Sequence, residues 1–105
     1  MHKLMVLYPE PDNRQAFIDY YTRDHLPLAA RLPGLLGWRY SMEISDGPAG
    51  SAAYFAVFEA DFPHAEAFRS AMASPEGQAV VADVPNYATG GAVVLDYAVV
   101  NGGAS

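Results

Sequence analysis

The residues best suited to chemistry are two tyrosines, an aspartate and a histidine that lie close together in the sequence. They are Tyr20, Tyr21, Asp24 and His25. An imidazole has an ordinary pKa of about 6.5, so it can exchange a proton near neutral pH, and a phenol can orient an oxygen atom of a bound compound. This group predicts general acid–base catalysis in which His25 moves a proton and Tyr21, or its neighbour Tyr20, orients the oxygen.

These residues fall on a predicted helix that begins near Asn13 and ends just past His25. Asp12 can cap the first turn, with Gln15 reaching back in a capping-box arrangement. Pro27 disfavours helical geometry at the residue before it, which predicts the end of the helix.

Five side chains form two neighbouring rows on this helix. At about 100° per residue, Phe17, Tyr21 and His25 share one row, and Tyr20 and Asp24 share the next. Polar groups on an apolar face need hydrogen-bond partners or a function. His25 and Tyr21 are therefore the predicted catalytic residues. The alternative for His25 is a histidine that donates to free carbonyls at a helix end, and the alternative for the tyrosines is core packing.

Further aromatic and amide side chains are candidates for a ligand pocket. Small-molecule pockets are mostly hydrophobic, with a few converging polar groups. The predicted substrate-binding residues are Tyr20, Asp24, Trp38, Tyr40, Tyr54, Phe58, Asn86 and Tyr87. Ordinary core packing is the alternative for most of the aromatic residues, and a role in a turn is the alternative for Asn86.

The whole chain predicts the order strand, helix, strand, strand, helix, strand. The strands are expected at residues 3–8, 36–44, 52–59 and 92–100, with a turn at 45–50 between the middle two. The second main helix covers residues 63–73 and is introduced by Asp61, and Ser74 caps a further short helix to about residue 84. This βαββαβ order predicts a ferredoxin-like α+β domain over residues 1–100, with a flexible tail at 101–105.

The predicted strands carry apolar side chains on both faces. In the first strand, Met5 and Leu7 alternate with Leu4 and Val6. Helices on one face of an antiparallel sheet leave the other face open, and an apolar open face needs a cover. We therefore expect a homodimer in which two sheets form an α+β barrel.

Several short motifs resemble the EthD family. They are Tyr8-Pro9, a Tyr-Tyr-x-x-x-His-x-Pro-Leu pattern at 20–28, Leu-Pro-Gly at 32–34, and the segments 74–78 and 83–87. The resemblance extends to about Val99 and implies the same dimeric α+β barrel. The family is named after a protein needed for bacterial ethyl tert-butyl ether degradation, so the resemblance implies a role in xenobiotic degradation. Relatives of this barrel include cofactor-free monooxygenases, lactone isomerases, polyketide cyclases and haem enzymes.

Composition excludes several functions. The chain has 105 residues, a net charge of −6 and only 6 Lys and Arg, which disfavours nucleic acid as a partner. It has no cysteine, and its histidines lack the spacing of a helical metal site, so no metal is expected. No nucleotide-binding glycine motif is present, and nothing in the sequence independently indicates haem, so no cofactor is expected. The apolar run at 4–8 is too short for a signal peptide or membrane segment, so a soluble cytoplasmic protein is expected.

Two classes of function fit these observations. The first is an enzyme that acts without a cofactor on a small apolar or aromatic metabolite, as an oxidoreductase or monooxygenase, or as an isomerase or cyclase. The second is a non-catalytic accessory protein that holds a small hydrophobic ligand for a partner oxidase. Both describe a small-molecule protein of organic-compound catabolism, and the sequence leaves the choice between them open.

Overall fold

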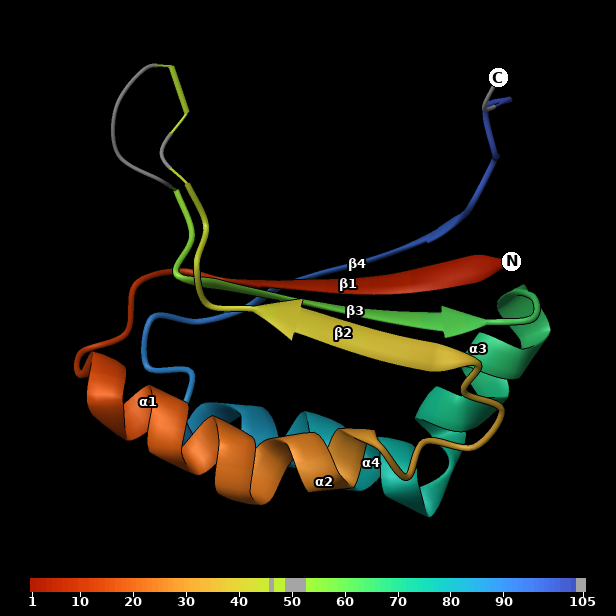
Figure 1. Ribbon diagram of the computed structural model, residues 1–105. Helices are drawn as coiled ribbons and strands as arrows, with labels where there is room; N and C mark the ends of the chain where they lie inside the picture. The colour runs from red at the N-terminus through yellow and green to blue at the C-terminus, as the bar shows by residue number, and fades with distance from the viewer. Residues whose placement is uncertain (46, 49–52, 104–105) are drawn as a thin grey trace.

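An antiparallel sheet with helices on one face forms the structure (Figure 1). The computed structural model describes residues 1–45, 47–48 and 53–103. Within these residues, the sheet has four strands in the order β2-β3-β1-β4, and all three neighbouring pairs are antiparallel. The strands are β1 (His2–Tyr8), β2 (Gly37–Ser41), β3 (Ala56–Phe62) and β4 (Val93–Ala98). The predicted ferredoxin-like α+β fold is confirmed.

The first helix is longer than predicted. It runs from α1 (Arg14–Tyr20) through a π-helical segment, η1 (Tyr21–His25), into α2 (Leu26–Ala29). The predicted end just past His25 is therefore wrong. The predicted cap is also wrong, because the side chain of Asn13, rather than Asp12, accepts a hydrogen bond from the Ala16 N–H at 2.9 Å.

The π-helical segment explains how the helix continues through Pro27. The N–H of Leu26 donates to the carbonyl of Tyr21, five residues earlier, so the helix is locally wider than an α-helix. This widening makes room for the proline ring, which would otherwise clash with the carbonyl four residues before it. Segments of this kind are frequent at functional sites, and this one carries Tyr21 and His25.

The second main helix differs from the prediction at its start. Asp61 is a residue of β3, where it pairs with Lys3 and Gly37, and does not introduce the helix. His64 caps α3 (Ala65–Ala73) instead, its Nδ1 accepting from the Ala67 N–H at 3.1 Å.

The predicted cap of the following helix is confirmed. Ser74 Oγ accepts from the Gly77 N–H at 3.1 Å at the start of α4 (Pro75–Asp83), which leads into the short 3₁₀ helix η2 (Val84–Asn86).

The middle strands differ from their predicted ranges. β2 ends at Ser41 and β3 begins at Ala56 and continues to Phe62, so the pair is shorter on the turn side than residues 36–44 and 52–59 suggest. Part of the predicted turn at 45–50 lies outside the described residues.

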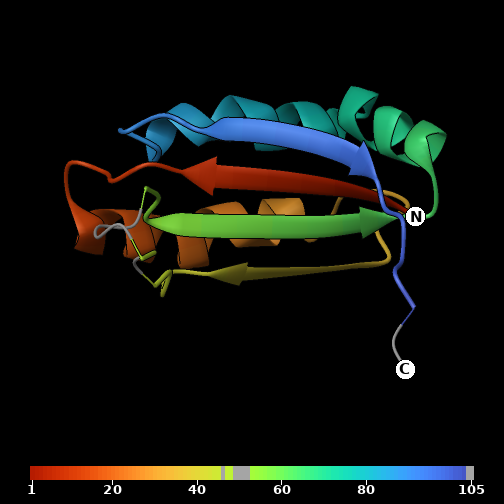
Figure 2. The same cartoon turned by 90° about the horizontal axis from the view of Figure 1, so that it is seen from above.

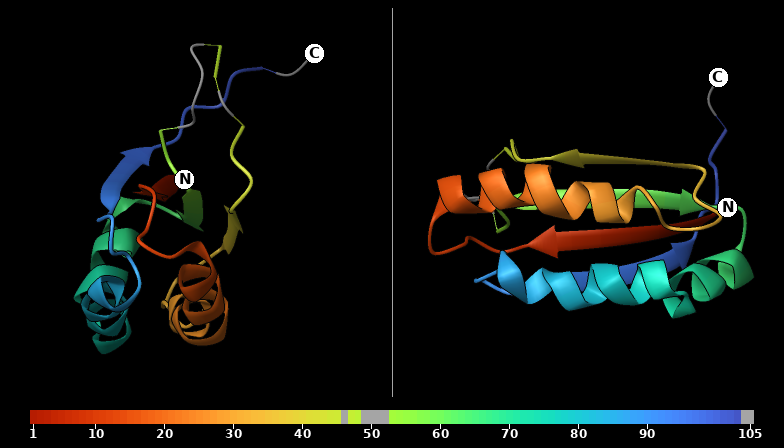
Figure 3. Two further views of the ribbon diagram at one scale, coloured as in Figure 1. Left: turned by 90° about the vertical axis from the view of Figure 1, so that its left-hand side faces the viewer. Right: turned by 90° about the horizontal axis from the view of Figure 1, so that it is seen from below.

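The core lies between the sheet and the helices, which form one layer beneath it (Figure 3). Along β1, His2, Leu4, Val6 and Tyr8 face the helices and are buried, while the alternate residues are partly exposed. This alternation is the period of two expected of a strand. It places one end of the core beside the helix that carries His25.

The helices all lie on one side of the sheet among the described residues, which leaves its outer face without a helix over it (Figure 2). This outer face carries apolar side chains. Met5 pairs with Leu95 and Leu7 with Val93, so these four residues share this face. Tyr97, the partner of Lys3, also belongs to it. Val93, Leu95 and Tyr97 are exposed. The predicted two-sided apolar pattern is therefore confirmed for Met5 and Leu7 of β1 and for β4. It is not confirmed for β3, because Glu59 and Asp61 share this outer face and form ion pairs with Lys3 and Arg39.

Candidate functional site

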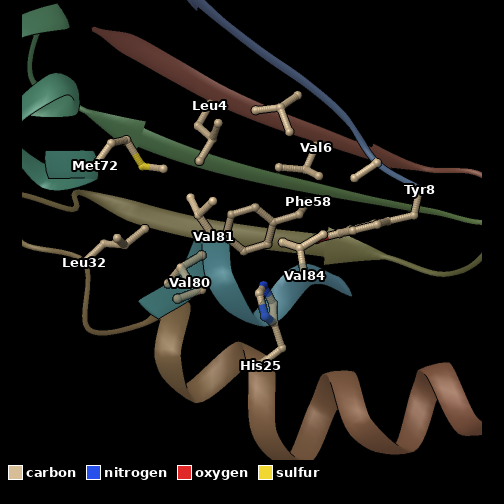
Figure 4. A pocket seen from close by; sticks show the side chains of 13 residues that line it. Leu4, Val6, Tyr8, His25, Leu32, Phe58, Met72, Val80, Val81 and Val84 are labelled. Carbon is tan, nitrogen blue, oxygen red and sulfur yellow. The ribbon is translucent and has the colours of Figure 1, made fainter. Parts of the chain in front are cut away.

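A cavity of about 250 Å³ lies between the sheet and the helices (Figure 4). The sheet contributes Leu4, Val6 and Tyr8 from β1, Phe58 from β3 and Val94 from β4, with Ala92 just before β4. The helical layer contributes His25, Ala29, Leu32, Met72, Val80, Val81 and Val84. Nearly all of these side chains are apolar, so the cavity suits an apolar ligand.

Two side chains of this lining are ionisable: the imidazole of His25 and the phenol of Tyr8. His25 lies at the end of η1 and is 3% exposed. Figure 4 shows its ring rising from the helix toward Phe58 and Val84. The predicted row of Phe17, Tyr21 and His25 is present as a run of stacked rings, with centroids 5.3 Å apart at each step.

Asp83, the last residue of α4, is the partner of His25. Its Oδ2 lies 2.8 Å from Nδ1 of His25. Tyr20 Oη donates to the other carboxylate oxygen at 2.5 Å, and Asn86 Nδ2 donates to the same oxygen at 3.0 Å. Both oxygens of the buried carboxylate are therefore hydrogen-bonded, which fixes its position.

Burial and hydrogen bonding set the charge state of this pair. Burial lowers the pKa of His25 and outweighs the opposing effect of the Asp83 carboxylate. Burial also acts to raise the pKa of Asp83, but the hydrogen bonds from Tyr20, Asn86 and His25 lower it further than burial raises it. The pair is therefore a carboxylate beside a neutral imidazole near pH 7.

This charge state determines which nitrogen carries the proton. A carboxylate only accepts hydrogen bonds, so Nδ1 of His25 holds the proton and donates it to Asp83. Of the two ring nitrogens of His25, Nδ1 has a hydrogen-bond partner, and Nε2 has none among the described residues. Nε2 therefore keeps an unshared electron pair and can act as a general base toward the cavity.

Two tyrosine rings pack against the imidazole. Tyr87 packs against it at 4.5 Å between centroids, and Tyr21 stacks on it nearly in parallel. The hydroxyls of Tyr8 and Tyr87 are 2.7 Å apart, while the buried hydroxyl of Tyr21 has no partner among the described residues. Burial raises the pKa of both Tyr21 and Tyr87, so these phenols stay protonated near neutral pH.

The predicted site residues divide into three groups. His25 and Phe58 line the cavity, and Tyr20, Tyr21, Asn86 and Tyr87 lie immediately behind this lining, around His25 and Asp83. The remaining four predicted residues are not brought to the cavity: Asp24, Trp38, Tyr40 and Tyr54.

Two of these remaining residues form a separate groove, and a third is engaged on the surface. Trp38 and Tyr40 of β2 stack on each other and line an open groove with Leu26 of α2. Asp24 pairs with the exposed side chain of Arg23 at 2.7 Å.

Sequence reasoning missed Asp83 and the aliphatic lining. Asp83 follows the apolar run Val80-Val81-Ala82 and lies 58 residues after His25, so only the packing of α4 beside η1 pairs the two. Its one sequence signal is its place at the start of the segment 83–87. Among the described residues, no three His, Cys, Asp or Glu side chains gather as a metal site. No helix in the described part of the chain is long and apolar enough to span a membrane.

The fold and cavity define a ferredoxin-like α+β domain with an apolar chamber between its helices and sheet. The chain belongs to the EthD family, because the EthD domain model matches residues 10–91.

Three proteins illustrate what the chain is similar to. An EthD family protein from Bacillus halodurans superposes with a TM-score of 0.87 at 28% identity, over 95% of this chain and 99% of that chain. An uncharacterized 11.0 kDa protein of Rhodococcus erythropolis, from the thcB-thcC intergenic region, is 32% identical over 90% of this chain and 91% of its own length. A dimeric ferredoxin-like protein of unknown function from Thermobifida fusca has a TM-score of 0.70 at 15% identity, over 93% and 90% of the two chains.

Proposed function

We propose that this protein binds a small, mainly apolar organic molecule in the cavity and that His25 removes a proton from it without a cofactor. The observation that supports this proposal is the buried His25–Asp83 pair at the wall of an otherwise apolar cavity. Asp83 orients the imidazole and fixes its proton on Nδ1, which leaves Nε2 as the base. Tyr20 and Asn86 hold Asp83 in place.

The reaction begins with proton transfer to His25. Nε2 takes a proton from an activated carbon or a hydroxyl of the ligand and becomes an imidazolium, and the ligand becomes an enolate or alkoxide. Return of the proton to another atom of the ligand completes an isomerisation. In a cyclisation, the enolate carbon attacks a second carbonyl of the same ligand, and the imidazolium returns its proton to the alkoxide that forms. If dioxygen is the co-reactant, the deprotonated ligand itself supplies the electrons: one of its CH₂ groups becomes a carbonyl with one oxygen atom, and the other oxygen atom leaves as water. This monooxygenation would make the protein an oxidoreductase of xenobiotic degradation.

Deuterium uptake from the solvent tests the proton transfer directly. Methyl hexyl ketone is a suitable probe because it has acidic C–H groups beside its carbonyl and an apolar tail. In D₂O, the wild-type protein is expected to accelerate deuterium uptake at these carbons, as measured by proton NMR, and His25→Gln is expected to remove the acceleration. Glutamine keeps an N–H group that can donate to Asp83 but provides no base.

A carrier function is the second proposal. It is supported by the scarcity of polar groups in the lining, since the hydroxyl of Tyr8 is already paired with Tyr87. A carrier would hold the ligand for a partner oxidase. Binding of the ketone without accelerated deuterium uptake would favour the carrier over the enzyme.

We also propose that the protein is a homodimer joined through the outer face of the sheet, as a dimeric α+β barrel. The apolar residues Met5, Leu7, Val93, Leu95 and Tyr97 on this face support it. The dimeric state given for the Thermobifida fusca protein supports it as well. A domain of this size gains stability by burying such a face against a second copy.

A further inference from the structure

Two of the residues that line the cavity are exposed to solvent. Val81 of α4 is 56% exposed and Val94 of β4 is 59% exposed, whereas the other lining residues are buried or half-buried. Val94 pairs with Val6, which is a buried member of the same lining, so its side chain faces the helical layer and not the outer face of the sheet. Its exposure therefore marks an opening at the edge of the cavity.

The topology explains why the opening lies there. β4 is an edge strand, because the sheet order ends with it. α4 runs beneath this edge, as the views from above and below both show (Figures 2 and 3). Every residue of β4 is exposed, so among the described residues no further element closes the gap between α4 and the strand.

The cavity is elongated and differs in polarity along its length. Leu4, Val6 and Tyr8 line it in succession, and a strand rises about 3.3 Å per residue, so the lining follows about 13 Å of β1. Figure 4 shows Leu4, Leu32 and Met72 toward one end and Tyr8 toward the other, with the ring of His25 between them, below Phe58 and Val84. The site therefore has an aliphatic end beyond His25.

We propose that ligands enter between Val81 and Val94 and that the preferred ligand is an aliphatic compound with one proton-bearing polar head, the head placed against His25 and the tail along Leu32 and Met72. This proposal rests on the function proposed above, because it uses the same cavity and the same base. It differs from the sequence-based prediction of a mainly aromatic pocket. Phe58 and Tyr8 are the phenyl and phenol rings in the lining, and its other apolar side chains are aliphatic.

The cavity volume sets the expected length of the tail. At about 30 Å³ per water molecule in the liquid, 250 Å³ corresponds to about eight water-sized groups. Each buried methylene contributes about 0.8 kcal/mol, so affinity should rise about fourfold for each added carbon until the cavity is full. In a series from n-butanol to n-decanol, the rise is expected to stop near n-octanol.

The polar head is tested with an isomer of n-octanol that has no hydroxyl. Heptyl methyl ether has the same atoms but cannot donate a hydrogen bond to Nε2 of His25. It is expected to bind about tenfold more weakly than n-octanol to the wild type, the scale of one lost hydrogen bond. In His25→Gln the two compounds should bind within about threefold of each other. Equal binding of both compounds to the wild type would overturn the placement of the head.

The entrance is tested by narrowing it. We expect Val81→Trp and Val94→Trp each to slow association of n-octanol at least tenfold in stopped-flow measurements. Ala82→Trp, at an exposed neighbouring position of α4 outside the lining, should change it less than twofold. Val81 lies on the surface of a helix, so this variant should stay folded, and thermal melts check each protein.

The results of these experiments distinguish a wrong entrance from a wrong proposed function. If n-octanol binds the wild type and both entrance variants at the same rate, and His25→Gln still weakens binding, the entrance is wrong and the proposed function stands. If n-octanol and the ketone fail to bind the wild type, both proposals are wrong.

Discussion

Nδ1 of His25 lies 2.8 Å from Oδ2 of Asp83, although the two residues are 58 positions apart in the sequence. The contact joins η1 of the first helical segment to the end of α4, and both lie in the helical layer beneath the sheet. It fixes the proton of the imidazole on Nδ1, beside Asp83. The proposed base therefore depends on how these two neighbouring helices pack against each other.

Removing the charge of Asp83 should impair proton transfer more than folding. An Asp83→Asn side chain can donate its amide N–H to Nδ1 of His25, which moves the imidazole proton to Nε2 and removes the base. We expect the rate of deuterium uptake by methyl hexyl ketone to fall by about two orders of magnitude or more. The binding of n-heptane, which needs no hydrogen bond, should change less than about threefold. An unchanged exchange rate in a folded Asp83→Asn protein would contradict the orienting role of Asp83.

Stability should fall as the pH drops below about 6.5. Because burial lowers the pKa of His25, its imidazole stays neutral in the folded protein to lower pH than in the unfolded chain, whose ordinary pKa is 6.5. The unfolded state then binds more protons, so acidification favours unfolding, with a slope of at most about 1.4 kcal/mol per pH unit from this residue.

Urea unfolding at a series of pH values measures this slope. His25→Gln should flatten the curve below about pH 6.5, with the other two histidines present in both proteins. A wild-type curve of the same shape as that of His25→Gln would show that His25 is not buried in its neutral form.

Tyr21 and Tyr8 should respond in opposite ways to loss of their hydroxyls. The hydroxyl of Tyr21 is buried without a partner among the described residues, so Tyr21→Phe should leave the free energy of unfolding unchanged or raise it by up to about 1 kcal/mol. Tyr8→Phe removes the partner of Tyr87 and should lower it by about 1–3 kcal/mol. A destabilised Tyr21→Phe protein would mean that its hydroxyl is hydrogen-bonded.

The proposed dimer should depend on the outer face of the sheet. Leu95→Lys places a charge on this face and should shift the protein from dimer to monomer in light scattering at micromolar concentration. Leu36→Lys is the matched control, because Leu36 is also an exposed leucine but precedes β2 and is not part of the described outer face. A monomeric wild-type protein would contradict the dimer.

Periodicity alone predicted the elements that depend on local pattern. The row formed by Phe17, Tyr21 and His25 follows from helical spacing, and the structure stacks these rings in that order. The βαββαβ order and the apolar outer face follow from alternation in the strands. These features are local, so they are readable before the chain is folded.

The remaining features depend on contacts between distant segments. The helix continues through Pro27 because a π-helical segment widens it, which the preference of a residue before proline does not reveal. Asp61 is a strand residue because Lys3 and Gly37 pair with it. Asp83 gains its role from His25 in another helix, and Trp38 and Tyr40 lie in a groove apart from the cavity. Residue type alone favoured aromatic side chains as the lining of the pocket. The packing of α4 under the sheet instead lines the cavity mainly with aliphatic side chains.

Nitrogen-15 NMR of the histidine rings measures which nitrogen of His25 carries the proton. In protein labelled at histidine, at pH 7, we expect His25 to be neutral, with the proton on Nδ1 and none on Nε2. Adding n-octanol should shift the Nε2 resonance of His25 and leave those of His2 and His64 in place, with His25→Gln identifying the signal. An imidazolium at His25, a proton on Nε2, or an unchanged Nε2 resonance in a protein that has bound n-octanol would show that His25 is not the base of this cavity.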